Sequence, residues 1–303
     1  MVIASNNGAR IDGDGGPFSP RPIKLRASRC IFSIDVEDWF HIMDLPAAPA
    51  MGQWKELPSL VERNAFRLLD LLETAGVRAT CFFLGWVAER HPNLVREAAA
   101  RGHEVASHGY AHDLVYEISP EGFFRDVQRA KRTLEDITGK PVQGYRAPGF
   151  SVTTSTPWFF EKLVRAGYKY SSSVFPTHRQ HGGFPGFHAG PCVIETSQGP
   201  IIEVPISTAK FLRMDICFFG GGYLRLFPYA LIEKMMKRVL ADGRPVVFYI
   251  HPREIDPQHP RLPMPFARRI KTYIGLRGTE AKLRRLLGSG STFLPFARVL
   301  ELN

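Results

Sequence analysis

Long hydrophobic runs are missing from this 303-residue sequence. Because no stretch of about 18 consecutive apolar residues occurs, we expect no segment to span a membrane. The four cysteines are widely separated and form no C-x-x-C pair, which excludes a disulfide framework and predicts buried, reduced thiols. A phosphate-binding glycine loop is also absent, since GGGYLRLF at 220–227 lacks the strand-to-helix context of one. We interpret that stretch as a flexible turn.

The N-terminal stretch MVIASNNGARIDGDGGPFSPRP lacks the apolar core of a signal peptide. It is rich in Gly, Pro, Asp and Ser, which predicts a disordered lead-in over 1–28. With no signal peptide and no disulfide framework, the simplest expectation is a cytoplasmic protein, working at the inner face of the membrane if it contacts lipid.

Acidic residues are outnumbered, with 29 Asp and Glu against 39 Lys and Arg and a net charge of +10. Much of the excess lies in RLPMPFARRIKTYIGLRGTEAKLRRLL, near the C-terminus. Two interpretations stay open: a solvated basic face, or peripheral contact with an anionic membrane surface. No basic-aromatic repeat occurs, so we expect no nucleic-acid partner.

Short β-branched or aromatic runs alternate with amphipathic stretches over most of the chain. Strands are expected at 30–36, 78–85, 103–108, 142–148, 168–174 and 245–251, and a hairpin at 190–206. Helices are expected at 59–76, 91–102, 119–139, 156–167 and 227–243. Ser59 and Glu62 have the spacing of a capping box at the first helix.

This alternation predicts an α/β fold with a parallel sheet, either a barrel or an open doubly wound sheet. We expect one barrel domain over 29–255 and a basic extension over 256–303 that packs on it or flanks it. Asp35, His108, Arg146 and His251 each fall at the end of an expected strand. The carboxyl ends of barrel strands share one face, where active sites form.

His108 and His112 are four residues apart, a spacing typical of zinc ligands. The run SIDVEDWF places Asp35, Glu37 and Asp38 within four residues at a strand end. Partly buried carboxylates repel one another, and a divalent cation would offset that repulsion. A polar loop without a metal is the alternative for these acids.

The combination of SIDVED, SHGYAH, YRAPGFS and FYIHP, spread over residues 30–255, resembles the polysaccharide deacetylase family, the NodB-homology carbohydrate esterases. The runs DVEDWF, FYIHPREIDPQHPR and GLRGTEAKLRRLL resemble more specifically the subgroup encoded near exosortase and exopolysaccharide loci. The resemblance implies a distorted (β/α) barrel of seven strands. It also implies metal-dependent hydrolysis of a linear amide, removing acetyl groups from N-acetylhexosamine units of a polysaccharide or lipid-linked glycan.

The same resemblance implies roles for individual residues. Asp35 would be the general base, His251 the general acid, and Arg146 the residue that tunes Asp35. His108 and His112 would bind one divalent ion, with Zn²⁺ expected and Co²⁺ or Ni²⁺ as alternatives.

Two departures from the usual family pattern bear on these roles. Val36 follows Asp35 where a second aspartate is usual, so the third ligand is Glu37 or Asp38. Gly109 stands where Ser or Thr is usual beside the first histidine.

Three aromatic residues are candidates for substrate contact: Trp39, Tyr110 and Phe150, the last at a position where many relatives have Tyr. Two other functions stay open. One is a metal-independent barrel hydrolase of a small amide, and the other is a non-catalytic basic glycan-binding protein. His41, next to the acidic strand end, is a second candidate acid should His251 not serve.

Overall fold

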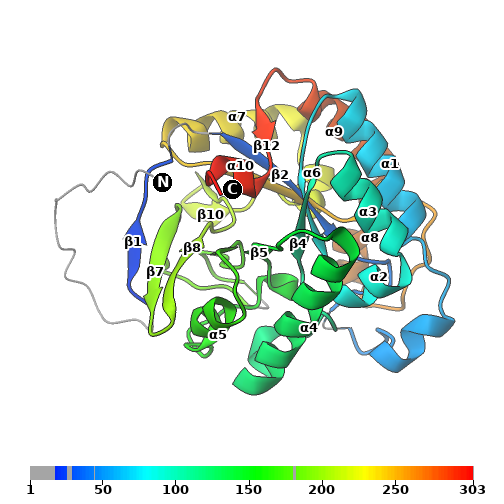
Figure 1. The fold of residues 1–303 in the computed structure, drawn as a ribbon. Coiled ribbons are helices and arrows are strands. Elements are labelled where there is room, and N and C mark those ends of the chain that lie inside the picture. Colours follow the sequence, from blue (N-terminus) through cyan, green and yellow to red (C-terminus); the bar gives the residue numbers. More distant parts are fainter. Residues whose placement is uncertain (1–17, 26–28, 44, 180–181, 303) are drawn as a thin grey trace.

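The computed structural model describes residues 18–25, 29–43, 45–179 and 182–302. Seven parallel strands form the centre of one sheet, in the order β8–β6–β5–β4–β3–β2–β11. Their bounds are β2 (Cys30–Val36), β3 (Thr80–Phe83), β4 (Glu104–Ser107), β5 (Gly144–Tyr145), β6 (Tyr170–Ser171), β8 (Gly199–Glu203) and β11 (Val246–Ile250). The strands surround a common centre and the helices lie outside them (Figure 1). This arrangement confirms the distorted (β/α) barrel with seven parallel strands; among the described residues no strand pairing joins β11 to β8, so the barrel is not closed by hydrogen bonds.

Additional strands flank this set. The expected hairpin forms from β7 (Cys192–Thr196) and β8, which pair antiparallel. β1 (Pro20–Pro22) pairs antiparallel with β7. The disordered lead-in predicted over 1–28 is therefore wrong for residues 18–25, while 1–17 and 26–28 lie outside the described residues. β9 (Ala209–Phe211) and β10 (Met214–Ile216) form a separate two-stranded sheet.

The end of the basic C-terminal segment packs on the barrel. β12 (Phe293–Leu294) pairs parallel with the first two residues of β2, Cys30 and Ile31. The backbone N–H groups of Phe296 and Ala297 donate to Thr80 and Glu104, on β3 and β4. Residues 293–297 thus pack against the amino ends of β2, β3 and β4.

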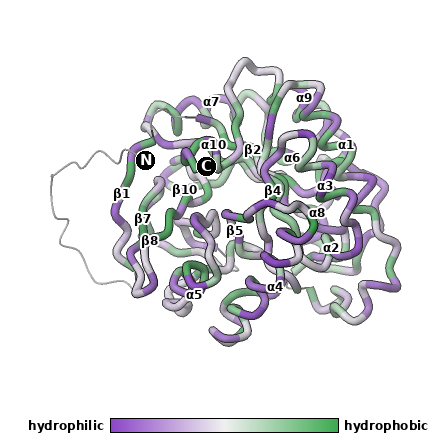
Figure 2. The backbone as a smooth tube through the Cα atoms, in the orientation of Figure 1, coloured by the Kyte–Doolittle hydropathy of each residue, from purple (hydrophilic) through white to green (hydrophobic). Residues whose placement is uncertain are grey.

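Ten α-helices occur among the described residues: α1 (Val61–Thr74), α2 (Gly85–Arg90), α3 (Pro92–Ala100), α4 (Pro120–Thr138), α5 (Phe159–Arg165), α6 (Gly221–Leu226), α7 (Tyr229–Ala241), α8 (Phe266–Tyr273), α9 (Thr279–Leu287) and α10 (Phe296–Val299). Helices at the periphery alternate between hydrophobic and hydrophilic residues along the chain (Figure 2), as elements with one buried face do. None of the helices described is both long and apolar enough to cross a membrane.

Two local predictions need correction. Residues 220–227 do not form a flexible turn, because Gly221–Leu226 is the helix α6. The capping box at Ser59 is also wrong: α1 begins at Val61, and the Ser59 hydroxyl donates to Asp38 at 2.6 Å. By contrast, α4 follows Ser119, whose hydroxyl accepts the Gly122 N–H, and ends at the left-handed Gly139.

The four cysteines are free and buried, as the sequence predicts. Burial raises the pKa of the Cys30 thiol to about 12, so it stays protonated.

Candidate active site at the carboxyl ends of the strands

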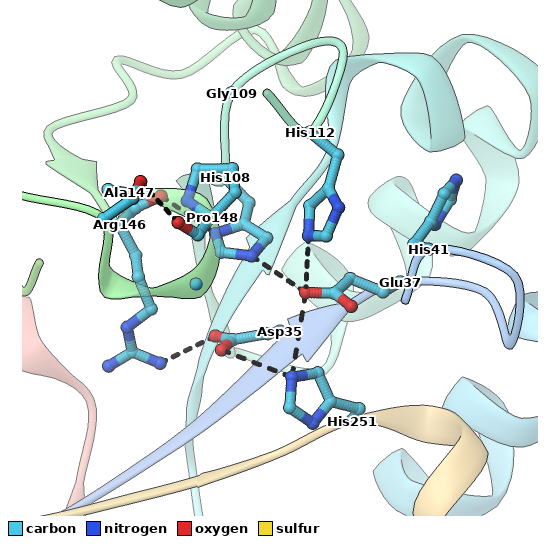
Figure 3. Close-up of polar contacts among 12 residues, drawn as sticks. Asp35, Glu37, His41, His108, Gly109, His112, Arg146, Ala147, Pro148 and His251 are labelled. Carbon is cyan, nitrogen blue, oxygen red and sulfur yellow. Dashed lines mark hydrogen bonds and ion pairs between the residues drawn. The ribbon is translucent and has the colours of Figure 1, made fainter. Parts of the chain in front are cut away.

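The side chains expected at the strand ends lie together on one face of the barrel (Figure 3). Asp35 belongs to β2, while His108, Arg146 and His251 follow β4, β5 and β11 directly. The Nε2 atom of His251 lies 3.9 Å from Asp35 Oδ2 and 3.7 Å from Glu37 Oε1. Parallel pairing of these strands brings residues from distant parts of the chain within a few ångströms of one another.

Glu37, His108 and His112 form a compact group that could hold a metal ion. Glu37 Oε1 lies 3.0 Å from the Nε2 atoms of both histidines. His108 Nδ1 lies 2.8 Å from the carbonyl oxygen of Arg146, which can only accept, so Nδ1 carries a proton. In the neutral ring, Nε2 then directs a lone pair at the Glu37 carboxylate.

A lone pair facing a carboxylate oxygen is unfavourable unless a cation lies between them, and all three side chains are buried. Although burial raises the pKa of Glu37, the charges of His112 and His251 outweigh it and hold that pKa well below its usual value. One carboxylate and two imidazoles therefore fit a divalent cation, with positions left for water and substrate. The carbonyl behind His108 is the kind of outer partner that orients a ligating histidine.

Asp38, the other candidate for the third ligand, has a different role. Its carboxylate accepts the N–H groups of Leu60 (3.1 Å) and Val61 (3.3 Å) at the start of α1. It also accepts from the Ser59 hydroxyl and from the N–H of Trp39. These donors occupy both of its oxygens, so the structure brings Glu37 and not Asp38 to the histidines.

The loop between the two histidines needs an unusual backbone. Gly109 has φ +78° and His112 has φ +60°, both in the left-handed region. Asp126 of α4 holds this turn by accepting the N–H groups of Tyr110 (2.8 Å) and Ala111 (2.9 Å). A Cβ atom at Gly109 would lie 2.9 Å from Asp126 Oδ2. Glycine at this position is therefore required by the turn that directs both imidazoles at Glu37.

Asp35 is hydrogen-bonded to Arg146, which is fully buried. Arg146 Nη1 donates to Asp35 Oδ1 at 2.7 Å and to the Ser33 hydroxyl at 2.8 Å. Its Nε donates to the carbonyl of Ser172, and its guanidinium lies 4.2 Å from the ring centroid of Phe82. Since Oδ1 is bound, Asp35 presents Oδ2 toward His251.

His251 has a partner that the sequence analysis missed. Its Nδ1 lies 3.0 Å from Glu254 Oε2, and Glu254 Oε1 accepts from Arg225 Nε at 3.1 Å. Burial lowers the pKa of His251, but the charges of Glu37 and Glu254 outweigh it and raise that pKa above its usual value. Arg225 and His251 hold the pKa of Glu254 at about 2 despite its burial. The sequence held one signal for this contact. Glu254 lies three residues after His251, on one turn of 3₁₀ helix (Pro252–Ile255).

The three aromatic candidates for substrate contact are packed in the interior, each with at most 6% of its surface exposed. The Trp39 indole donates to the carbonyl of Pro58, and the Tyr110 hydroxyl donates to Glu89. The Phe150 ring packs on Tyr249, and its N–H donates to the carbonyl of Ala147. Because all three are buried, none presents a ring face on which a sugar could stack, so these assignments are corrected.

His41 lies on the far side of Glu37 from His251 (Figure 3). Its Nδ1 accepts the N–H of Asp38, and its ring lies against those of Trp54 and Trp86. Burial holds the pKa of His41 well below its usual value, which disfavours the imidazolium form that a general acid needs.

Comparison with known proteins agrees with this geometry. Residues 56–171 match the family described as Polysaccharide deacetylase, and residues 172–301 match a Domain of unknown function, DUF3473. The resemblance to the polysaccharide deacetylase family is thus confirmed over residues 56–171. The subgroup suggested by the sequence stays a prediction, with which the DUF3473 match is consistent.

Among curated proteins, a putative polysaccharide deacetylase, YheN of Bacillus subtilis, is 34% identical over 106 residues, which are 34% of this chain and 37% of that protein. A peptidoglycan deacetylase of Helicobacter pylori is 30% identical over 108 residues, 36% of each protein. The chain thus spans about a third of the length of these relatives.

Solved structures share the fold over nearly the whole chain. A putative polysaccharide deacetylase from Mycobacterium smegmatis has a TM-score of 0.61 at 20% identity, covering 94% of both chains. The Puue allantoinase has a TM-score of 0.59 at 16% identity, covering 96% of this chain and 93% of its own. Two differently named enzymes thus fit about equally well, so the fold alone does not select an activity.

The site is assembled from three parts of the chain. Asp35 and Glu37 precede the matched deacetylase segment, which contributes His108, His112 and Arg146. His251 comes from the DUF3473 segment.

Proposed function

We propose that this protein is a metal-dependent N-deacetylase that removes acetyl groups from N-acetylhexosamine units of a polysaccharide or lipid-linked glycan. The observation that carries the proposal is the contact of Glu37 Oε1 with the Nε2 atoms of His108 and His112, each at 3.0 Å. His251 Nε2 lies 3.7 Å from Glu37 Oε1 and 3.9 Å from Asp35 Oδ2, so a base and an acid for amide hydrolysis lie beside this group.

Glu37, His108 and His112 would hold one divalent ion, with Zn²⁺ the best match to two imidazoles and a carboxylate. When bound, such a cation polarises the amide carbonyl and makes water more acidic. Co²⁺ and Ni²⁺ are the alternatives to be compared by reconstitution.

The remaining chemistry falls to the chain's own side chains. Asp35, held at Oδ1 by Arg146, takes a proton from the attacking water at Oδ2. The water oxygen bonds to the carbonyl carbon. His251, held at Nδ1 by Glu254, gives the proton on Nε2 to the amide nitrogen as the C–N bond breaks. The C=O bond re-forms as the amine leaves, giving a free amine on the sugar and acetic acid, which ionises to acetate. Asp35 then releases its proton to solvent and His251 takes one up before the next turnover.

A glycan substrate is supported by the names of the relatives, which are polysaccharide and peptidoglycan deacetylases. An exopolysaccharide as the particular glycan, and a site of action at the inner face of a membrane, follow only from the sequence resemblance and the basic C-terminal segment. A metal-independent amidase is less well supported, because it has no use for two buried imidazoles directed at one carboxylate.

Replacing His251 by alanine tests its role as the acid. We expect His251→Ala to lower the rate on an N-acetylated sugar by about 10²–10⁴-fold, because an amine leaving group needs a proton. On an aryl acetate ester the loss should be far smaller, since the phenolate leaves as a stable anion. Acetate release from both substrates is the measurement. Equal losses on the amide and the ester would show that His251 serves structure or binding and does not donate the proton.

A further inference from the structure

The helix α8 exposes an apolar face that no described part of the chain covers. Phe266 is 73% exposed, Ile270 45% and Ile274 38%. These residues are four apart, so they lie on one side of the helix and its end. Tyr273 is the buried residue of α8. An exposed apolar helix face of this kind marks a site of contact with another molecule or with a membrane.

The surroundings of this face are strongly basic. Residues 257–279 contain five Lys and Arg and not one Asp or Glu. Arg261, Arg269, Lys271 and Arg277 are exposed, while Arg268 donates to the carbonyl of Met43 and so ties α8 to the loop after β2. A segment with exposed apolar side chains, exposed cations and no acidic residue matches the boundary between the headgroups and acyl chains of an anionic bilayer.

The same helix is tied to the candidate active site. Arg225 Nη1 donates to the carbonyls of Thr272 (2.9 Å) and Ile274 (2.8 Å) at the end of α8. Arg225 Nε binds Glu254, which in turn binds His251. The next residue, Leu226, is 50% exposed and extends the apolar surface from α6.

We propose that the exposed face of α8, formed by Phe266, Ile270 and Ile274, docks on an anionic lipid surface through these side chains and the neighbouring cations. Docking there holds the bilayer close to the strand ends that carry His251. Presentation of a lipid-linked glycan to the site rests on the proposed deacetylase function, whereas docking on lipid does not.

Sedimentation with vesicles tests the docking. Wild-type protein should bind vesicles of about one-third phosphatidylglycerol in phosphatidylcholine, bind pure phosphatidylcholine much more weakly, and be released at about 0.5 M NaCl, where charges are screened. The double variant F266D/I270D should lose more than tenfold in binding. The double variant R269E/K271E should lose about thirtyfold or more, because each cation near the surface contributes about fivefold.

Leu212→Asp is the matched control. Leu212 is 78% exposed on the turn between β9 and β10, so it undergoes the same change outside α8 and should bind vesicles like the wild type. Thermal unfolding should be nearly unchanged in all variants, since the replaced side chains are exposed.

Binding that is equal on both kinds of vesicle, or that survives F266D/I270D, would overturn the proposal. So would a wild-type dimer that dissociates in F266D/I270D while vesicles go unbound, because α8 would then contact a second copy. None of these readouts depends on deacetylation, so the docking can fail while the proposed function stands.

Discussion

Asp35→Asn should abolish deacetylation while leaving the metal bound. Asp35 Oδ2 is the oxygen available to take a proton from water, and an amide in its place cannot do so. Removal of a general base lowers rates by about 10²–10⁴-fold. The asparagine can still accept from Arg146 through its carbonyl oxygen, which keeps the geometry. Acetate release and metal content, measured on the same preparation, check the prediction.

Ser33→Ala is the matched control for this variant. It removes the other acceptor of Arg146 Nη1, also buried, without touching the proposed base. We expect a loss of unfolding free energy of about 1–3 kcal/mol from the unsatisfied donor, and only a small change in rate. If Asp35→Asn strips the metal, or if Ser33→Ala loses as much rate as Asp35→Asn, then Asp35 does not act as the base.

The second large effect concerns the metal ligands. Glu37→Ala, His108→Ala and His112→Ala should each lower metal affinity by more than the roughly 10–100-fold that changes to outer partners cost. Activity should fall with the metal. Metal content after dialysis against buffers of known free Zn²⁺ gives the affinity directly.

Asp38→Ala should behave in the opposite way. It leaves the N–H groups of Leu60 and Val61 without their acceptor, so we expect about 2–4 kcal/mol less unfolding free energy. Its metal affinity should stay near that of the wild type. A variant Asp38→Ala that loses the metal, beside a Glu37→Ala that keeps it, would reverse the assignment.

The barrel could be predicted from the sequence because its strands are apolar runs bounded by loops, and β2 is confirmed at Cys30–Val36. Elements without that pattern were missed. β1 and β12 have three and two residues, too few for any periodicity, and pair with strands far away in the chain. The helix α6 was missed because three consecutive glycines at 220–222 suggest a turn.

The candidate site, like the fold, was predictable from the sequence only in part. The positions of Asp35, His108, Arg146 and His251 at strand ends predicted that these side chains would lie close together, because the carboxyl ends of parallel strands share one face of the barrel. The choice between Glu37 and Asp38 could not be made, because Asp38 is occupied by N–H groups of α1, 22 and 23 positions further along the chain. The exposure of an aromatic residue could not be predicted from its position next to site residues in the sequence, and Trp39 is buried.

The measurement that tests the central claim most directly is acetate release after metal removal and return. Purified protein is assayed on oligomeric and polymeric N-acetylglucosamine glycans and on lipid-linked N-acetylated sugars, before chelation, after it, and after addition of one equivalent of Zn²⁺. We predict one free amine for each acetate released, loss of both on chelation, and recovery with Zn²⁺ in the wild type but not in Glu37→Ala. Acetate release that persists at full rate without metal, or a fully metal-loaded protein that releases no acetate from any of these glycans, would contradict the account.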